Sequence, residues 1–278
     1  MGTVSDIIGN ELTGDIERVR IEIGSGLVEI TPADGEQTTA RLEVINGSAE
    51  DVTFKISGGE LIVELAKQFA RRGPEVRVYI ATPATLDARI KTGSGDISAR
   101  MPLGESRLSS GSGDIRAERI DGSLAAGTGS GDIKVGYAAG TVRASTGSGS
   151  IDIAESANAV GLSTGSGDVR VGDAAGPTTV KVGSGDITIE RIRDHSVATS
   201  GSGDVTVELA DGPSVRAETA RGDVHIGVPD GVPTYLDLKT VTGHIRCDLE
   251  ATQRPAEGER SLMLRARSFS GDITVHKV

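Results

Sequence analysis

Hydrophobic and polar residues alternate with a period of two along much of the chain. Val19, Ile21 and Ile23 alternate with charged residues, and similar runs follow over residues 40–44, 52–56, 61–65 and 76–80. This alternation predicts β-strands that bury one face and expose the other. Residues 66–73 (AKQFARRG) break the pattern, and we expect a short helix or a protruding loop there. The basic pair Arg71 and Arg72 in that segment is interpreted as solvated surface rather than as a partner contact.

A fixed repeat governs the middle of the chain. The phrase TGSGDI at residues 92–97 returns at six successive intervals of 18 residues, with its aspartate position at Asp96, Asp114, Asp132, Ser150, Asp168, Asp186 and Asp204. The phrase then loosens at residues 221–224, 242–245 and 270–273, with intervals of 19, 21 and 28 residues. A repeat of this length indicates a solenoid in which each coil packs on its neighbours.

Two apolar columns follow the aspartate position in the aligned repeats. The first holds Ile97, Ile115, Ile133, Ile151, Val169, Ile187, Val205 and Val224, and the second holds Ala99, Ala117, Val135, Ile153, Val171, Ile189, Val207 and Ile226. Each coil also has a mid-repeat turn and a second alternating stretch. We therefore predict an all-β, single-stranded β-helix, with three faces favoured over a flattened two-faced roll, in which only the first and last coils have open edges.

The repeat divides the chain into four parts. We assign an N-terminal cap or tail to residues 1–17, an irregular β portion of the solenoid to 18–91, the regular array to 92–222 and irregular coils to 223–278. Residues 24–30 (GSGLVEI) look like a degenerate copy of the phrase, which favours an N-terminal part that is irregular solenoid rather than a separate fold.

The repeated phrase has the chemistry of a corner. Glycine adopts backbone angles forbidden to other residues, and serine or aspartate can cap nearby backbone N–H groups. The predicted structural turn glycines are Gly93, Gly95, Gly111, Gly113, Gly129, Gly131, Gly147, Gly149, Gly165, Gly167, Gly183, Gly185, Gly201 and Gly203. Stacked hydroxyls such as Thr128, Thr146 and Thr164 are expected to form a hydrogen-bonded internal ladder rather than an ice-binding face.

The stacked aspartates raise the question of cation binding. Carboxylates at a coil spacing of about 4.8 Å repel one another, so they must face solvent, accept backbone hydrogen bonds or bind cations. The weak cation candidates, with Ca²⁺ as the ion, are Asp96, Asp114, Asp132, Asp168, Asp186 and Asp204. The nonapeptide that binds Ca²⁺ in β-rolls supplies ligands every nine residues, and these repeats do not, so capping is favoured.

No constellation in the sequence points to catalysis or to a cofactor. An aromatic content of 2% offers few stacking platforms for a carbohydrate-cleaving site. The histidines His195, His225, His244 and His276 lack a distinctive spacing, although His225 and His244 could meet on adjacent coils. A metal site would still need further ligands. We therefore expect no enzyme activity, no cofactor and no specific metal.

The net charge limits the kinds of binding partner, and the cysteine content and the start of the chain bear on the cell compartment. A net charge of −11 argues against nucleic acid and anionic membranes, which attract clustered Lys and Arg. The single cysteine, Cys247, excludes an intramolecular disulfide framework and is expected to be a small buried filler. The start of the chain has no leader pattern and no apolar run is long enough to span a membrane, so we expect a cytoplasmic protein, although a chain whose leader had been removed would look the same.

The TGSGD[IV] units, preceded by residues 76–83 (VRVYIATP), resemble the bacterial putative-adhesin β-strand-repeat family, a domain family of unknown function. The resemblance extends over residues 19–278 and implies a right-handed single-stranded β-helix. It brings no catalytic residues, because the family has no established chemistry.

The leading functional hypothesis is a non-enzymatic scaffold or interaction protein, a rigid acidic β-helix that presents its faces and end strands to a protein partner or to another copy. One alternative is an adhesin-like module that binds glycans or other cells after export. Another is end-to-end polymerisation like that of bactofilins, because the chain finishes in an alternating strand with Ile273, Val275 and Val278.

Overall fold

The computed structural model describes residues 8–45, 47–66, 73–250 and 260–278. This part of the chain is all-β, with 27 described strands and one described 3-10 turn, η1 (Ala49–Asp51). None of the described helical structure has the length and apolar character needed to cross a membrane. Arg71 and Arg72 lie outside the described residues. The chain forms two compact units, residues 1–138 and 139–278, which are taken in turn below.

The first unit consists of two ladders of strands. One ladder runs, in spatial order, through β1 (Ile8–Gly14), β4 (Thr38–Ile45), β7 (Glu75–Thr82), β3 (Ser25–Pro32), β9 (Asp96–Ala99), β11 (Ile115–Ile120) and β13 (Ile133–Ala138). The other runs through β5 (Val52–Ser57), β6 (Glu60–Leu65), β2 (Arg18–Ile23), β8 (Leu86–Thr92), β10 (Leu103–Ser110) and β12 (Leu124–Thr128). The pairings of β1 with β4, β4 with β7 and β5 with β6 are antiparallel, and the others are parallel.

The coil made by β2 and β3 lies out of sequence order. β2 pairs with both β6 and β8, and β3 pairs with both β7 and β9, so this early coil sits between two later ones. Val28 stands opposite Ile97, so residues 24–30 align with the repeat phrase in the neighbouring coil. The coil of β2 and β3 therefore belongs to the same two ladders as the regular repeats, whereas β1, β4 and β5 join the ladders by antiparallel pairing.

The second unit repeats the two-ladder design. One ladder contains β15 (Ile151–Ser156), β17 (Val169–Ala174), β19 (Ile187–Ile192), β21 (Val205–Ala210), β23 (Val224–Val228), β27 (Ile273–Lys277) and β25 (Ile245–Cys247). The other contains β14 (Val142–Thr146), β16 (Val160–Ser166), β18 (Thr178–Ser184), β20 (Ser196–Ser202), β22 (Ser214–Arg221), β26 (Leu262–Ser270) and β24 (Thr234–Thr242). All of the pairings described here are parallel.

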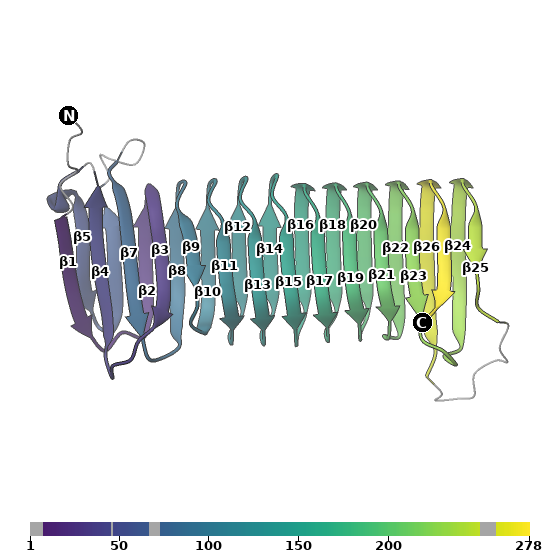
Figure 1. The fold of residues 1–278 in the computed structure, drawn as a ribbon, viewed down its shortest axis with the longest axis horizontal. Helices are drawn as coiled ribbons and strands as arrows, with labels where there is room; N and C mark the ends of the chain where they lie inside the picture. The colour runs from purple at the N-terminus through teal and green to yellow at the C-terminus, as the bar shows by residue number, and fades with distance from the viewer. Residues whose placement is uncertain (1–7, 46, 67–72, 251–259) are drawn as a thin grey trace. The chain divides into compact units, whose positions relative to one another are not determined.

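The C-terminal coil also lies out of order. β26 pairs with both β22 and β24, and β27 pairs with both β23 and β25, so the last coil of the chain is interior and the coil of β24 and β25 ends the stack (Figure 1). The expectation that the C-terminal strand forms an open edge is therefore wrong. Among the described strands, β24 and β25 are paired on one side only.

The predicted columns form the core of each unit. Ile115 stands opposite Ile133, and Val169 opposite Ile187, each an 18-residue step, and all four side chains are at most 1% exposed. The β-helix is confirmed, and each regular coil gives one strand to each of the two ladders. The first strand of a coil bends: in β11 the pairing skips Glu118, and this residue and the next both face solvent.

Candidate functional site

The repeated aspartates cap the backbone of the following coil. The Oδ1 atom of Asp96 accepts the backbone N–H of Asp114 at 2.8 Å, and Oδ1 of Asp186 accepts that of Asp204 at 2.8 Å. Asp114 caps Asp132, and Asp168 caps Asp186, each at 2.9 Å. One oxygen of each of these carboxylates is therefore engaged by the protein itself.

The ladder continues where the repeat becomes irregular. Ser150 replaces a carboxylate with its hydroxyl, which accepts the N–H of Asp168 at 3.3 Å. Beyond Asp204 the caps run to Asp223, then to Asp272, and finally to the N–H of His244. This last contact makes the main contribution to the lowered pKa of Asp272. No group of three or more His, Cys, Asp or Glu side chains in the described part of the chain is arranged to hold a metal ion.

The corner glycines are needed because coils approach one another closely. A Cβ at Gly111 would lie 2.2 Å from the carbonyl oxygen of Gly93, and one at Gly185 would lie 2.3 Å from that of Gly167. The sequence predicts glycine at the corners because of unusual backbone angles there. A positive φ is found at Gly185 (141°) but not at Gly111. The same approach to a neighbouring carbonyl, at 2.1–2.8 Å, holds at Gly93, Gly95, Gly113, Gly129, Gly131, Gly165, Gly167, Gly183, Gly201 and Gly203.

Buried hydroxyls join the coils from inside, as predicted. Thr128 Oγ1 donates to the carbonyl of Gly113 at 3.0 Å, and Thr164 Oγ1 donates to that of Gly149 at 2.9 Å. Thr146 Oγ1 accepts the backbone N–H of Gly149 at 3.1 Å. These side chains are 4–8% exposed. The corner motif is thus occupied by structural hydrogen bonds on both its inner and its outer side.

Large exposed apolar side chains gather in the last coils instead. Among the described residues they are Val197, Tyr235, Leu236, Val241, Ile245, Met263, Phe269 and Val278. All except Val197 follow the regular array. The sequence carried a signal for this, because outward positions in the array are mostly small or polar, whereas Tyr235, Met263 and Phe269 occupy such positions on β24 and β26.

Cys247 belongs to the same exposed end. Its predicted role as a buried filler is wrong, because the side chain is exposed. The alternation that suggested burial is real, but β25 pairs only with β27 among the described strands. An inward position in a terminal coil has a neighbouring coil on one side only.

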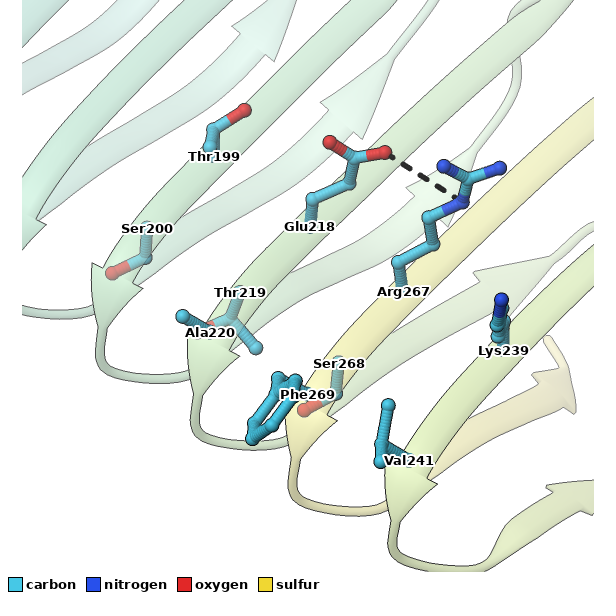
Figure 2. A pocket seen from close by; sticks show the side chains of 10 residues that line it. All are labelled: Thr199, Ser200, Glu218, Thr219, Ala220, Lys239, Val241, Arg267, Ser268 and Phe269. Carbon is cyan, nitrogen blue, oxygen red and sulfur yellow. Dashed lines mark ion pairs between the residues drawn. The ribbon is translucent and has the colours of Figure 1, made fainter.

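A shallow groove crosses the outer face of the second ladder beside this end. It has a volume of about 430 Å³ and is lined by Thr199, Ser200, Glu218, Thr219, Ala220, Lys239, Val241, Arg267, Ser268 and Phe269. Figure 2 shows Phe269 and Val241 beside the turns, with Lys239, Arg267 and Glu218 lying further along the strands. Phe269 and Val241 are 63% and 58% exposed, so the groove offers apolar surface next to charge.

Two charged rows cross the strands that carry this groove. Strand register aligns Arg216, Arg265 and Asp237 in one row, and Lys181, Glu218, Arg267 and Lys239 in the next. Five cations and two anions give these rows a net charge of +3 (5 − 2), on a chain whose net charge is −11. The surface is therefore locally cationic, which suits a ligand with negative charge.

Ion pairs fix the geometry around the groove. Arg267 Nε lies 3.9 Å from Glu218, and Arg265 Nε lies 2.7 Å from Asp237. Further along the same unit, Arg191 and Arg260 both donate to the carboxylate of Asp211. The hydrogen bond from Arg191 is the main cause of the lowered pKa of Asp211.

The histidines do not form a site together. His225 on β23 stands opposite Thr274 on β27, and Thr274 in turn stands opposite Arg246 on β25. The inserted β27 therefore separates His225 from the coil of His244. The expectation that these two histidines could meet on adjacent coils is wrong, because the order of the coils differs from the order of the sequence.

Comparison with solved structures supports the fold. A putative adhesin from Parabacteroides merdae matches with a TM-score of 0.53 at 12% identity, covering 98% of this chain and 96% of that one. A putative adhesin from Bacteroides fragilis matches with a TM-score of 0.39 at 12% identity (98% and 97% covered). A putative lipid binding protein from Parabacteroides distasonis gives 0.41 at 13% identity (99% and 98% covered). At these identities the likeness concerns the fold alone.

Comparison with sequence families gives a direct assignment. No curated protein matches the chain. The family model described as Toastrack DUF4097 matches residues 16–276, which include strands β2 to β26 and all but the last residue of β27. On this match the chain belongs to the Toastrack DUF4097 family.

Proposed function

We propose that this chain is a non-enzymatic interaction protein that binds an acidic, partly apolar segment of a protein partner in the groove beside Phe269 and Val241. The observation that carries the proposal is the gathering of exposed apolar side chains around a locally cationic surface at one end of the second unit. Exposed apolar patches rimmed by polar residues are typical of interaction sites.

The geometry suits an extended peptide. The groove is open and crosses parallel strands, so a peptide could lay one apolar side chain against Phe269 while its carboxylates approach Lys239 and Arg267 (Figure 2). Aromatic and arginine side chains are the residues most enriched in the energetically important parts of interfaces. The description of a protein of similar fold as a putative adhesin also supports binding rather than catalysis.

Selection from a random peptide library on the purified protein tests the proposal. We expect enriched peptides to combine acidic and apolar residues, and their affinity to fall about ten-fold or more in Phe269→Ser and in Arg267→Glu. Arg143→Glu is the matched control, because Arg143 is an exposed arginine on β14 of the same ladder, away from the groove. Peptides that bind Arg267→Glu and the wild type equally would contradict the proposal.

The adhesin-like alternative makes a different prediction. A module that binds glycans should retain individual glycans on an array, and the binding should not depend on acidic peptides. Glycan binding that survives Phe269→Ser, together with no selectable peptide, would favour that alternative over the groove.

A further inference from the structure

We propose that β24 pairs antiparallel with β24 of a second copy of this chain, in a closed dimer with Leu238 at its two-fold axis. This interface uses the edge of the sheet. Lys239 and Val241 also line the groove, but the dimer is argued from the strand edge and does not depend on the proposed function. Its occupant is a second copy because the edge is complementary to itself.

β24 is an unusually open edge. It is nine residues long and, among the described strands, pairs only with β26. Natural proteins protect edges with short strands, prolines, bulges or charged side chains. Residues 234–242 contain no proline, and their two charged residues, Asp237 and Lys239, have opposite signs. The other strand at this end, β25, has three residues, so β24 is the longer of the two free edges among the strands described there.

The backbone fixes which residues of β24 face outward. Leu262 donates its N–H to the carbonyl of Pro233 at 2.9 Å, whereas Met263 donates to Pro213 at 2.9 Å on the opposite side of β26. In a parallel ladder this alternation continues along both strands. The odd-numbered residues of β24 therefore bond to β26, and the even-numbered residues direct their N–H and C=O groups to the open edge.

One antiparallel register pairs the even-numbered residues with each other and also pairs the strand over its full length. When Leu238 stands opposite Leu238 of the second copy, Thr234 stands opposite Thr242 and all nine residues are paired. The even-numbered residues then form the hydrogen-bonded pairs of an antiparallel ladder. Neighbouring registers leave one end of each strand unpaired.

The same register pairs the outward side chains favourably. Asp237 stands opposite Lys239 of the second copy, and Tyr235 stands opposite Val241, each pair occurring twice by symmetry. The register one step to either side places Asp237 opposite Asp237, or Lys239 opposite Lys239. No described carboxylate lies within ion-pair distance of Lys239 in its own chain, whereas Asp237 pairs with Arg265 and Arg267.

The inner side of the coil gains cover in the same arrangement. Leu236 is 41% exposed, whereas Leu264, which stands opposite it on β26, is fully buried. Pairing β24 across the axis brings Leu236 toward Thr240 of the second copy and extends the core. Parallel addition of a further coil is disfavoured, because His244 occupies the position from which an aspartate would cap it.

Sedimentation and light scattering of the full chain over a range of concentrations test the dimer. We expect a monomer–dimer equilibrium whose dissociation constant rises about ten-fold or more in Lys239→Glu, because two attractive pairs become two repulsive ones. Lys181→Glu is the matched control, since Lys181 is an exposed lysine in the same cross-strand row, with three strands between its own strand β18 and the edge strand β24. A protein that stays monomeric up to its solubility limit, or that forms open polymers, overturns the proposal.

Cross-linking tests the register. In a Cys247→Ser background, Leu238→Cys should form a covalent dimer on mild oxidation, because opposed residues in an antiparallel pair lie within disulfide reach. Leu236→Cys in the same background should not, since its two copies are displaced by four residues, about 14 Å along the strand. Equal cross-linking of the two variants, or of Leu236→Cys alone, overturns the register.

Discussion

Replacing Thr164 with valine removes one hydroxyl from the interior ladder without changing the shape of the side chain. Thr164 is 4% exposed, and its Oγ1 donates to the carbonyl of Gly149 at 2.9 Å. The variant loses this hydrogen bond and leaves the buried carbonyl of Gly149 without that donor, which costs about 1–3 kcal/mol. Burial of the new methyl group offsets about 0.8 kcal/mol of this loss. We expect a net destabilisation of about 1 kcal/mol, within a range of about 0.2–2.2 kcal/mol.

The chain contains a natural counterpart of this variant. Val182 occupies the same column on β18 and is 5% exposed, so one coil already lacks the hydroxyl. Val182→Thr would place a donor in the position that faces the carbonyl of Gly167, as Ser200 faces that of Gly185 at 3.0 Å. Because burial of the hydroxyl opposes the new bond, we expect a stabilisation of only about 0–1 kcal/mol.

Thermal unfolding followed by circular dichroism measures both effects. A loss of about 1 kcal/mol corresponds to a fall in Tm of about 2–4 °C in a chain of this size. Thr179→Val is the control, because Thr179 is exposed on β18 and its loss should change stability by less than about 0.5 kcal/mol. If Thr164→Val and Thr179→Val unfold at the same temperature, the ladder does not stabilise the coils and the reasoning fails.

Three further predictions concern the corners and the ion pairs. Asp186→Asn keeps a side-chain oxygen that can cap the next coil, whereas Asp186→Ala does not, so the alanine variant should have a lower Tm than the asparagine variant. If Ca²⁺ raised the Tm of the wild type but of neither variant, the aspartates would form a cation site rather than caps. Gly185→Ala should destabilise strongly because its Cβ would meet a carbonyl at 2.3 Å, whereas Gly161→Ala, with 3.9 Å to the nearest atom, should be tolerated; equal melting of the two would contradict the packing argument. The lowered pKa of Asp211 means that its contribution to stability is present above the ordinary aspartate value of about 3.9 and is lost as pH falls through the folded-state pKa. Asp211→Asn should therefore flatten the acid side of the stability profile, and an unchanged profile would count against the assignment.

The regular array could be predicted from the sequence because its contacts are local in the repeat. Residues one repeat apart, such as Ile115 and Ile133 or Val169 and Ile187, stand opposite each other on paired strands. Aligning the repeats in the sequence therefore also identifies the residues that pair between coils. The predicted aspartate caps and internal hydroxyls follow from the same registration. The bend at Glu118 did not follow, because it depends on strand pairing that the alternation of hydrophobic and polar residues does not encode.

The ends could not be predicted in the same way, because spatial order departs from chain order there. Asp272 stacks on Asp223, a step of 49 residues, and His244 follows it outward. The copy that retains Gly and Asp at residues 270–273 continues the ladder better than the nearer copy at 242–245. A quality-of-match criterion, rather than sequence proximity, would have placed Cys247 at the exposed end.

Interior coils of the array are nearly interchangeable, and this bears on where function lies. Ser150 replaces an aspartate and Val182 replaces a hydroxyl, yet the strands around both keep their register. A coil that tolerates such substitutions supplies stability through its neighbours rather than through unique chemistry. The last coils differ, because they combine exposed apolar surface with a free strand edge. They contain Tyr235, His244 and Phe269, which depart from the residue types of the repeat columns. Recognition is therefore expected to depend on the irregular coils, and substitutions there should impair binding while leaving the melting temperature of the array nearly unchanged.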